Sequence, residues 1–267
     1  MSVARSIRAF PTLLRVGAYE ALAYRGEMLV WILATTMPLV MLALWSAVAR
    51  DAPVGRYTEA GFVAYFLATF VVRQLTGAWV FYTMNFEVRT GALSMRLLRP
   101  VHPLLAYTAE SLASMPLRVA VSVPIAAVSL AIVGTGAVTH DPWIWLAWAV
   151  SVAGAWLLSL FVNFIVGCTA FFAESSVKFM DAWLVFYFVL SGYLVPIDLF
   201  PPAVRAALEW LPFRYLLGFP VELMTGALSR GDAAALLARQ WAWVVVGLGG
   251  TSLMWRRGLR RFAAYGG

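Results

Sequence analysis

The longest stretch of the sequence without a charged side chain covers residues 142–173, and it limits the possible folds more than any other feature. A helix needs roughly 20 mainly apolar residues to cross a bilayer, and this stretch is long enough. The composition agrees, because 62% of the residues are hydrophobic and only 12% are charged, against about 25% charged residues in a soluble domain. The sequence therefore predicts a membrane protein.

Six segments meet the length requirement and predict an all-α membrane protein with six transmembrane helices in one domain, residues 1–267. These segments are residues 28–49, 60–86, 104–139, 142–173, 179–196 and 233–255. Residues 1–27 mix arginines with apolar side chains, which favours an N-terminal interfacial helix. Residues 197–232 are too polar and too rich in proline to form one span, so we expect outer re-entrant helices there.

Basic residues outside the spans predict the orientation of the chain. If the N-terminus is inside, twelve Lys and Arg residues lie on the cytoplasmic side and five on the other side. Because cytoplasmic loops are enriched in Lys and Arg, we expect both termini in the cytoplasm and the chain in the inner (plasma) membrane. The same bias explains the net charge of +7 better than binding to nucleic acid does.

A short amphipathic segment, residues 87–99, lies between the second and third spans. Its charged residues can ring one apolar face of a helix; the set is Arg89, Arg96 and Arg99 around Leu93, Leu97 and Leu98. Pro100 ends the helix, and Gly91 permits a close approach or a special backbone angle. Such a helix can lie at the membrane surface and contact a soluble partner.

The run EVRTGALSMRLLRP at 87–100 resembles the first cytoplasmic loop of type-two ABC exporter permeases. In that family a similar run forms the coupling helix that the ATPase contacts. SGYLVPIDLFPP at 191–202 and LPFRYLLGFPVELMTG at 211–226 are similar to the end of the fifth span and the outer re-entrant helices of these permeases. The resemblance extends over essentially the whole chain.

The resemblance implies a membrane-spanning half of an ATP-driven exporter, two of which form the pore as a homodimer or with a sister permease. Separate P-loop ATPase subunits would bind ATP and Mg and hydrolyse the nucleotide. The sequence is consistent with this division, because it contains no G-x-x-x-x-G-K-[ST] run. We therefore expect no enzyme activity, cofactor or metal on this chain. Its aromatic, weakly charged path would suit a lipid or a hydrophobic drug.

The resemblance also assigns roles to residues. It implies ATPase coupling for Glu87, Arg89, Gly91, Leu93, Arg96, Leu97 and Arg99. Glu174 and Lys178 are candidates for a second ATPase contact, although their i, i+4 spacing also suits a salt bridge within one helix. Family analogy places the second and fifth spans at the central cavity and the re-entrant helices at its outer end. The candidates are Phe66, Phe70, Arg73, Gln74, Asp181, Phe186 and Val189 for the translocation pathway, and Pro196, Phe200, Pro212 and Phe213 for the outer gate.

Arg73 interrupts the second span, where an unpaired charge costs about 3 kcal/mol or more. It should therefore face protein or water. Two interpretations remain open: a structural pair with an acid such as Glu110 or Asp181, and a polar lining of the substrate path.

A protein of a different class also remains possible, namely a passive channel or a membrane assembly scaffold without an ATPase. Catalysis by this chain has little support. His102 and His140 fall on opposite sides of the membrane in the predicted topology, and the sequence contains neither H-E-x-x-H nor G-x-S-x-G.

Overall fold

The computed structural model describes residues 3–24, 26, 30, 35–133, 138–173 and 176–262. Within these ranges the chain is helical, with loops and a single isolated β-bridge between Val54 and Tyr57. The larger helices are α1 (Val3–Ala23), α3 (Met37–Val48), α4 (Glu59–Thr76), α5 (Val80–Thr90), α7 (Pro103–Ala113), α8 (Met115–Val133), α9 (Pro142–Cys168), α10 (Ser176–Leu190) and α14 (Arg230–Phe262). The shorter ones are α6 (Leu93–Leu97), η2 (Thr169–Phe171), η3 (Ile197–Leu199), α11 (Pro202–Leu208), α12 (Phe213–Leu216) and α13 (Gly218–Met224).

Four helical segments in the described ranges are long and apolar enough to cross a membrane. They are Glu59–Thr90, Pro103–Val128, Pro142–Phe171 and Arg230–Phe262. The chain is thus an all-α, multi-pass membrane protein. The first and fifth predicted spans correspond to shorter helices, α3 with 12 residues and α10 with 15, and part of segment 28–49 lies outside the described residues.

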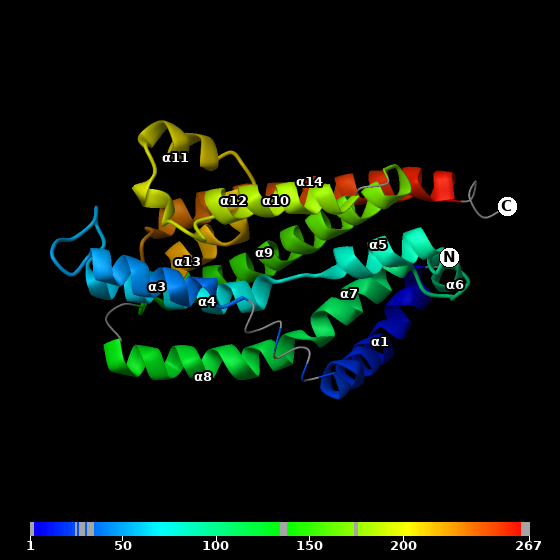
Figure 1. The fold of residues 1–267 in the computed structure, drawn as a ribbon, viewed down its shortest axis with the longest axis horizontal. Coiled ribbons are helices and arrows are strands. Elements are labelled where there is room, and N and C mark those ends of the chain that lie inside the picture. The colour runs from blue at the N-terminus through cyan, green and yellow to red at the C-terminus, as the bar shows by residue number, and fades with distance from the viewer. Residues whose placement is uncertain are drawn as a thin grey trace.

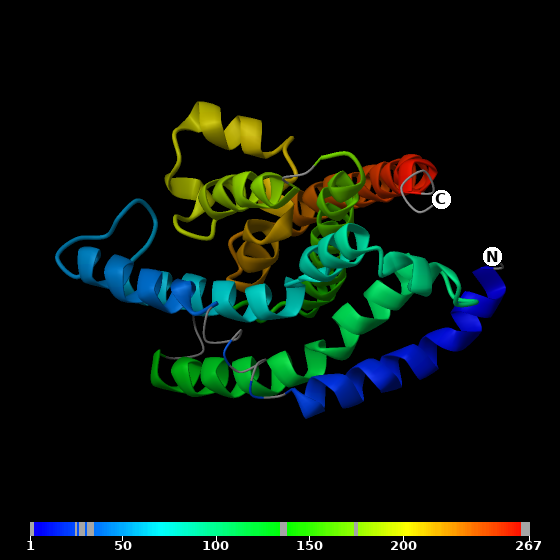
Figure 2. The same ribbon diagram turned by 45° about the vertical axis from the view of Figure 1, so that its right-hand side comes forward.

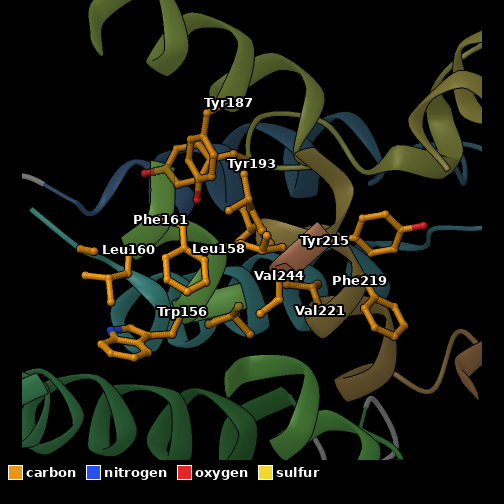
Figure 3. Close-up of a cluster of buried hydrophobic side chains, with 14 of the residues drawn as sticks. Trp156, Leu158, Leu160, Phe161, Tyr187, Tyr193, Tyr215, Phe219, Val221 and Val244 are labelled. Carbon is orange, nitrogen blue, oxygen red and sulfur yellow. The ribbon is translucent and has the colours of Figure 1, made fainter. Parts of the chain in front are cut away.

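Helices α9 and α14 pack along each other at the centre of the bundle (Figure 1). Small residues allow the close approach, since a β-carbon on Gly154 would lie 3.0 Å from the side chain of Gln240. The Gln240 amide donates hydrogen bonds to the carbonyl oxygens of Ser151 and Tyr215, both at 2.9 Å. Gln240 therefore joins α14 to α9 and to α12. Around this contact, apolar side chains of several helices form the buried core shown in Figure 3.

The second predicted span, 60–86, is two helices and not one. Gly77 is extended (φ −66°, ψ 125°) and separates α4 from α5. Backbone groups freed inside a membrane need protein partners, and two side chains supply them here. Arg118 Nη1 donates to the Gly77 carbonyl oxygen at 2.6 Å, and the Phe81 N–H donates to Asn163 Oδ1 at 3.2 Å.

The third predicted span, 104–139, is also divided. Helix α7 ends at Ala113, α8 begins at Met115, and the two helices run in different directions (Figure 2). Pro116 in the first turn of α8 explains the division, because proline cannot continue the hydrogen bonding of α7. Helix α1 packs along α7, where a β-carbon on Gly17 would lie only 2.8 Å from that of Ala113.

The start of α1, the α5–α6 corner and the end of α14 lie at the same end of the molecule (Figures 1 and 2). The 50–58 loop and α11 lie at the opposite end. This arrangement agrees with the predicted grouping of residues 1–27, 87–99 and the C-terminal arginines on one side of the membrane. That this side is cytoplasmic stays a prediction.

Candidate functional site

The predicted coupling helix, 87–99, is a corner between α5 and α6. Gly91 ends α5 in the left-handed conformation (φ 77°), which glycine adopts without strain, so the special backbone angle predicted there is confirmed. The predicted apolar face does not act as one surface. Of its three leucines, Leu93 is fully buried and Leu97 is half-buried, whereas Leu98 is 79% exposed. Met95, which is not part of the predicted face, is 67% exposed.

Arg96 joins three helices at this corner. Its Nε and Nη2 atoms donate to the two carboxylate oxygens of Glu87 at 2.9 and 2.6 Å, and its Nη1 donates to Glu110 Oε1 at 2.7 Å. A planar guanidinium suits this two-point contact with a carboxylate. Burial of Arg96 disfavours its charged form, but the hydrogen bonds to Glu87 and Glu110 outweigh this effect and raise the pKa of Arg96 above its usual value. Arg96 therefore ties α6 to α5 and α7 and is not exposed for docking.

Tyr107 completes the cluster from α7. Its ring lies under the guanidinium, with the centroid 4.2 Å from Arg96 Cζ, and its hydroxyl donates to Glu87 Oε2. The Glu87 carboxylate is thus held by a cation and by a phenol. Both contacts stabilise the same geometry of the corner.

Replacing Tyr107 with phenylalanine should lower the stability of the protein by about 1.5 kcal/mol, because hydrogen bonds to charged groups are stronger than neutral ones. Thermal unfolding of the purified chain in detergent measures the change. Tyr82→Phe is a suitable control, since that ring is 43% exposed, and it should change the unfolding temperature little. Equal shifts in the two variants would contradict the assigned role of Tyr107.

The corner also contacts the chain that leads into α10. Arg89 Nη2 donates to the Ala173 carbonyl oxygen at 3.1 Å, and its Nε donates to Asn85 Oδ1 at 3.3 Å. Asn85 Oδ1 also accepts a hydrogen bond from the Ser176 hydroxyl. Lys178 is exposed two residues further on, and Glu174 lies outside the described residues. The two predicted ATPase-contact segments are therefore neighbours in space.

A groove with a volume of about 680 Å³ opens beside the corner. Residues of α5, α6, η2 and the end of α14 line it, among them Arg89, Ser94, Phe172 and Phe262. The two phenylalanines were not predicted, because each lies far from residues 87–99 in the chain. Only the packing of η2 and α14 against the corner brings them there.

The sequence profile of a family described as "ABC-2 family transporter protein" matches residues 37–266 of the chain. The chain belongs to the ABC-2 transporter family. The predicted resemblance is thereby confirmed, and the chain is a permease, the membrane subunit of an ABC transporter. ABC-2 permeases have no nucleotide-binding domain of their own and work with an ATPase subunit. No curated protein matches the chain.

The predicted pathway residues of this ABC-2 permease fall into two groups. Phe66 and Phe70 on α4 are 0% and 1% exposed and lie inside the helix bundle. Phe186 and Val189 on α10 are 55% and 44% exposed, and Asp181 on the same helix is also exposed. The α10 residues are thus accessible to a substrate or a second subunit, whereas the two phenylalanines of α4 are not accessible in this conformation.

Arg73 and Gln74 occupy different environments in the permease. The Gln74 amide is buried and donates to Thr35 Oγ1 at 3.0 Å. The Arg73 guanidinium lies over the rings of Trp79 and Tyr187, with Cζ 5.4 and 5.3 Å from their centroids. In the described ranges Arg73 has no ion pair with either predicted acid, and Glu110 is bound by Arg96.

The residues predicted for the outer gate lie around η3 and at the start of α12. Pro196 is buried directly before η3, and Phe200 follows η3. Phe213, which follows Pro212 at the start of α12, stacks on Trp183 of α10 with ring centroids 5.0 Å apart.

A buried ion pair, Arg214 Nη2 to Glu222 Oε2 at 2.6 Å, joins α12 to α13. This pair was not predicted, because a spacing of eight residues suggests no contact within one helix.

Proposed function

We propose that this permease forms one half of the translocation pathway of an ATP-driven exporter and that a separate P-loop ATPase acts on the α5–α6 corner. One observation carries the proposal: a short helix with two exposed apolar side chains, Met95 and Leu98, is fixed to the bundle by ionic contacts and borders a large groove. Exposed apolar residues beside polar ones are typical of protein docking surfaces.

The ionic contacts give the corner a mechanical role. Arg96 connects α6 to α5 and to α7, and these helices lead into α4 and α8. A displacement of α6 by the ATPase would therefore move these membrane helices together as a rigid body. ATP and Mg would be bound by the ATPase alone.

In the proposed transporter the chain crosses the membrane six times, with α3 and α10 as the two short spans and both termini in the cytoplasm. A second copy, or a sister permease, covers the exposed apolar side of α10, where Phe186 and Val189 lie. In this arrangement the outer end of the pathway is lined by Pro196, Phe200, Pro212 and Phe213. A lipid or a hydrophobic drug is the substrate class that an aromatic path favours.

The test uses side chains that face outward, because Glu87 and Arg96 are engaged inside the corner. The variants Met95→Asp and Leu98→Asp should reduce recovery of the ATPase with the tagged permease, and its stimulated hydrolysis, by about tenfold or more, as expected for charged groups placed in an apolar interface. Leu211→Asp is the control, since Leu211 is 38% exposed and lies in the connection between α11 and α12, away from α6 in the chain, and it should leave recovery of the ATPase unchanged.

Native-membrane purification with identification of the bound subunits decides between the exporter and the passive channel or scaffold. Recovery of a P-loop subunit that the two corner variants lose would support coupling at α6. A homo-oligomer without ATPase would overturn the proposal. Full recovery of the ATPase with both corner variants would place the coupling contact elsewhere.

A further inference from the structure

Two arginines meet at the break between α4 and α5. Arg73 belongs to α4 and Arg118 to α8, and both lie in segments that are long and apolar enough to span the membrane. A β-carbon built on Gly77 would lie 3.0 Å from Arg118 Nη1 and 3.6 Å from Arg73 Nη1. The two guanidinium groups therefore reach the same point of the structure.

No carboxylate within the described ranges forms an ion pair with either arginine. Arg118 Nη1 donates to the Gly77 carbonyl oxygen, and Arg73 Nε is buried without a hydrogen-bond partner in that part of the chain. A single charge at the centre of a bilayer costs about 3 kcal/mol on insertion scales, and two neighbouring cations also repel each other. An anion bound between the arginines would offset both costs.

A small cavity lies at this position. Its volume is about 30 Å³, and Arg73, Asn163 and Tyr187 are among the residues that line it. This is about the space of two water molecules, which suits the two oxygen atoms of a carboxylate or two oxygens of a phosphate. The Tyr187 side chain is 5% exposed, and its hydroxyl makes no hydrogen bond to the described residues. Tyr187 lies next to Tyr193 at the edge of the core in Figure 3.

The Nε donor of Arg73, which has no hydrogen-bond partner among the described residues, can bind such a group. Trp79 and Tyr187 contact the guanidinium through their rings, whereas a guanidinium binds anions through the N–H groups in its plane. Tyr187 lines the cavity and belongs to α10. Its neighbour Phe186, together with Val189, offers exposed apolar surface on the same helix.

We infer that Arg73 and the Tyr187 hydroxyl, which line the cavity, bind the carboxylate or phosphate head group of an amphiphile, whose apolar chain lies along α10. Arg118, which does not line the cavity, adds its positive charge from beside Gly77. We further infer that this anionic amphiphile is the transported substrate, a step that rests on the proposed function. The inference explains why a span that is otherwise apolar carries an arginine beside a helix break.

Binding by the permease alone tests the site without any ATPase. The full chain is placed in nanodiscs of phosphatidylcholine, which has no net charge, and equilibrium binding of radiolabelled dodecanoic acid is compared with that of dodecanol, with empty nanodiscs as the blank. The acid should bind at least about tenfold more tightly, a difference that corresponds to about 1.4 kcal/mol. Equal affinities for the acid and the alcohol would overturn the inference, and this comparison needs no altered protein.

Substitutions then assign the effect to the two arginines. Arg73→Gln and Arg118→Gln should each weaken binding of the acid by about tenfold and leave binding of dodecanol unchanged, because only the charged head group loses a partner. Arg205→Gln, at an exposed arginine of α11, is the matched control and should bind like the parent chain. Unchanged affinity in both glutamine variants would exclude this cavity as the site.

A last comparison separates a transported substrate from a lipid that remains bound. Dodecanoic acid and dodecyl phosphate should stimulate the hydrolysis of ATP by the purified transporter complex. Arg73→Gln should abolish this stimulation, whereas Arg205→Gln, at the exposed arginine of α11, should retain it. An anionic phospholipid that copurifies and that neither probe displaces would show a resident lipid and overturn the substrate assignment. Absence of any ATPase would refute the proposed function, whereas the binding result on the permease would still stand.

Discussion

An Arg96→Leu variant should unfold at a clearly lower temperature than the parent chain. The substitution leaves the carboxylates of Glu87 and Glu110 without their cation, and the side chains of Arg96 and Glu87 are only 13% and 14% exposed. Removing one partner of a buried pair costs about 3–5 kcal/mol. We expect a loss near the lower limit, about 3 kcal/mol, because the Glu110 side chain is 40% exposed. Thermal unfolding in detergent, followed by circular dichroism, measures it.

Arg99→Leu is the matched control for this prediction. Arg99 lies three residues further along, has the same side chain and is exposed, so its replacement should change the unfolding temperature by a small amount, as is usual for surface positions. If both leucine variants unfold at the parent temperature, the contacts of Arg96 with Glu87 and Glu110 do not hold the corner together.

Gly192→Ala should lower the free energy of unfolding by a similar amount, about 2–5 kcal/mol, because two costs add. The backbone of Gly192 has φ 90°, and a residue with a side chain in a left-handed conformation costs about 1–2 kcal/mol. The new methyl group would also lie 2.6 Å from the Tyr65 hydroxyl oxygen, which donates a hydrogen bond to the Gly192 carbonyl oxygen at 2.8 Å. Overpacking of this kind costs roughly another 1–3 kcal/mol.

Gly91→Ala separates the two contributions. Gly91 has a comparable φ of 77°, but, its chain neighbours aside, no atom of the described residues lies within 4 Å of the position that its β-carbon would occupy. Its alanine variant should therefore show only the backbone cost, about 1–2 kcal/mol. Unfolding temperatures of the two variants, measured side by side in the same detergent, test the difference. An equal loss at both positions would show that the contact with Tyr65 contributes nothing.

The membrane class and most of the helix positions were predictable from the sequence. The length and apolar composition of a run such as 142–173 indicate a membrane-spanning helix without information from other segments. The break at Gly77 was not predictable in the same way. The sequence around it contains no proline, and the groups that satisfy the freed backbone come from Arg118 and Asn163 on other helices. A break of this kind depends on tertiary structure and leaves little local signal.

The candidate site was predictable only where a local sequence signal marks it. Gly91 marks the end of α5 in the sequence, since glycine is favoured at such ends. The pairing of Glu87 with Arg96 spans nine residues across a corner and cannot be read from helical spacing. Arg73 was expected to pair with an acid or to line a path, and its contacts in the described ranges are with aromatic rings. Phe66 and Phe70 were chosen by family analogy, which identifies a helix but not the side of it that is exposed.

The common location of the start of α1, the end of α14 and α6 at one end of the molecule (Figure 1) has a consequence for protein engineering. A peptide tether attached at either terminus reaches α6 without passing around the membrane bundle. Short flexible tethers hold a fused domain at millimolar effective concentration. An ATPase domain could therefore be fused to either terminus of this permease and would remain at a high local concentration beside the corner on which it is proposed to act.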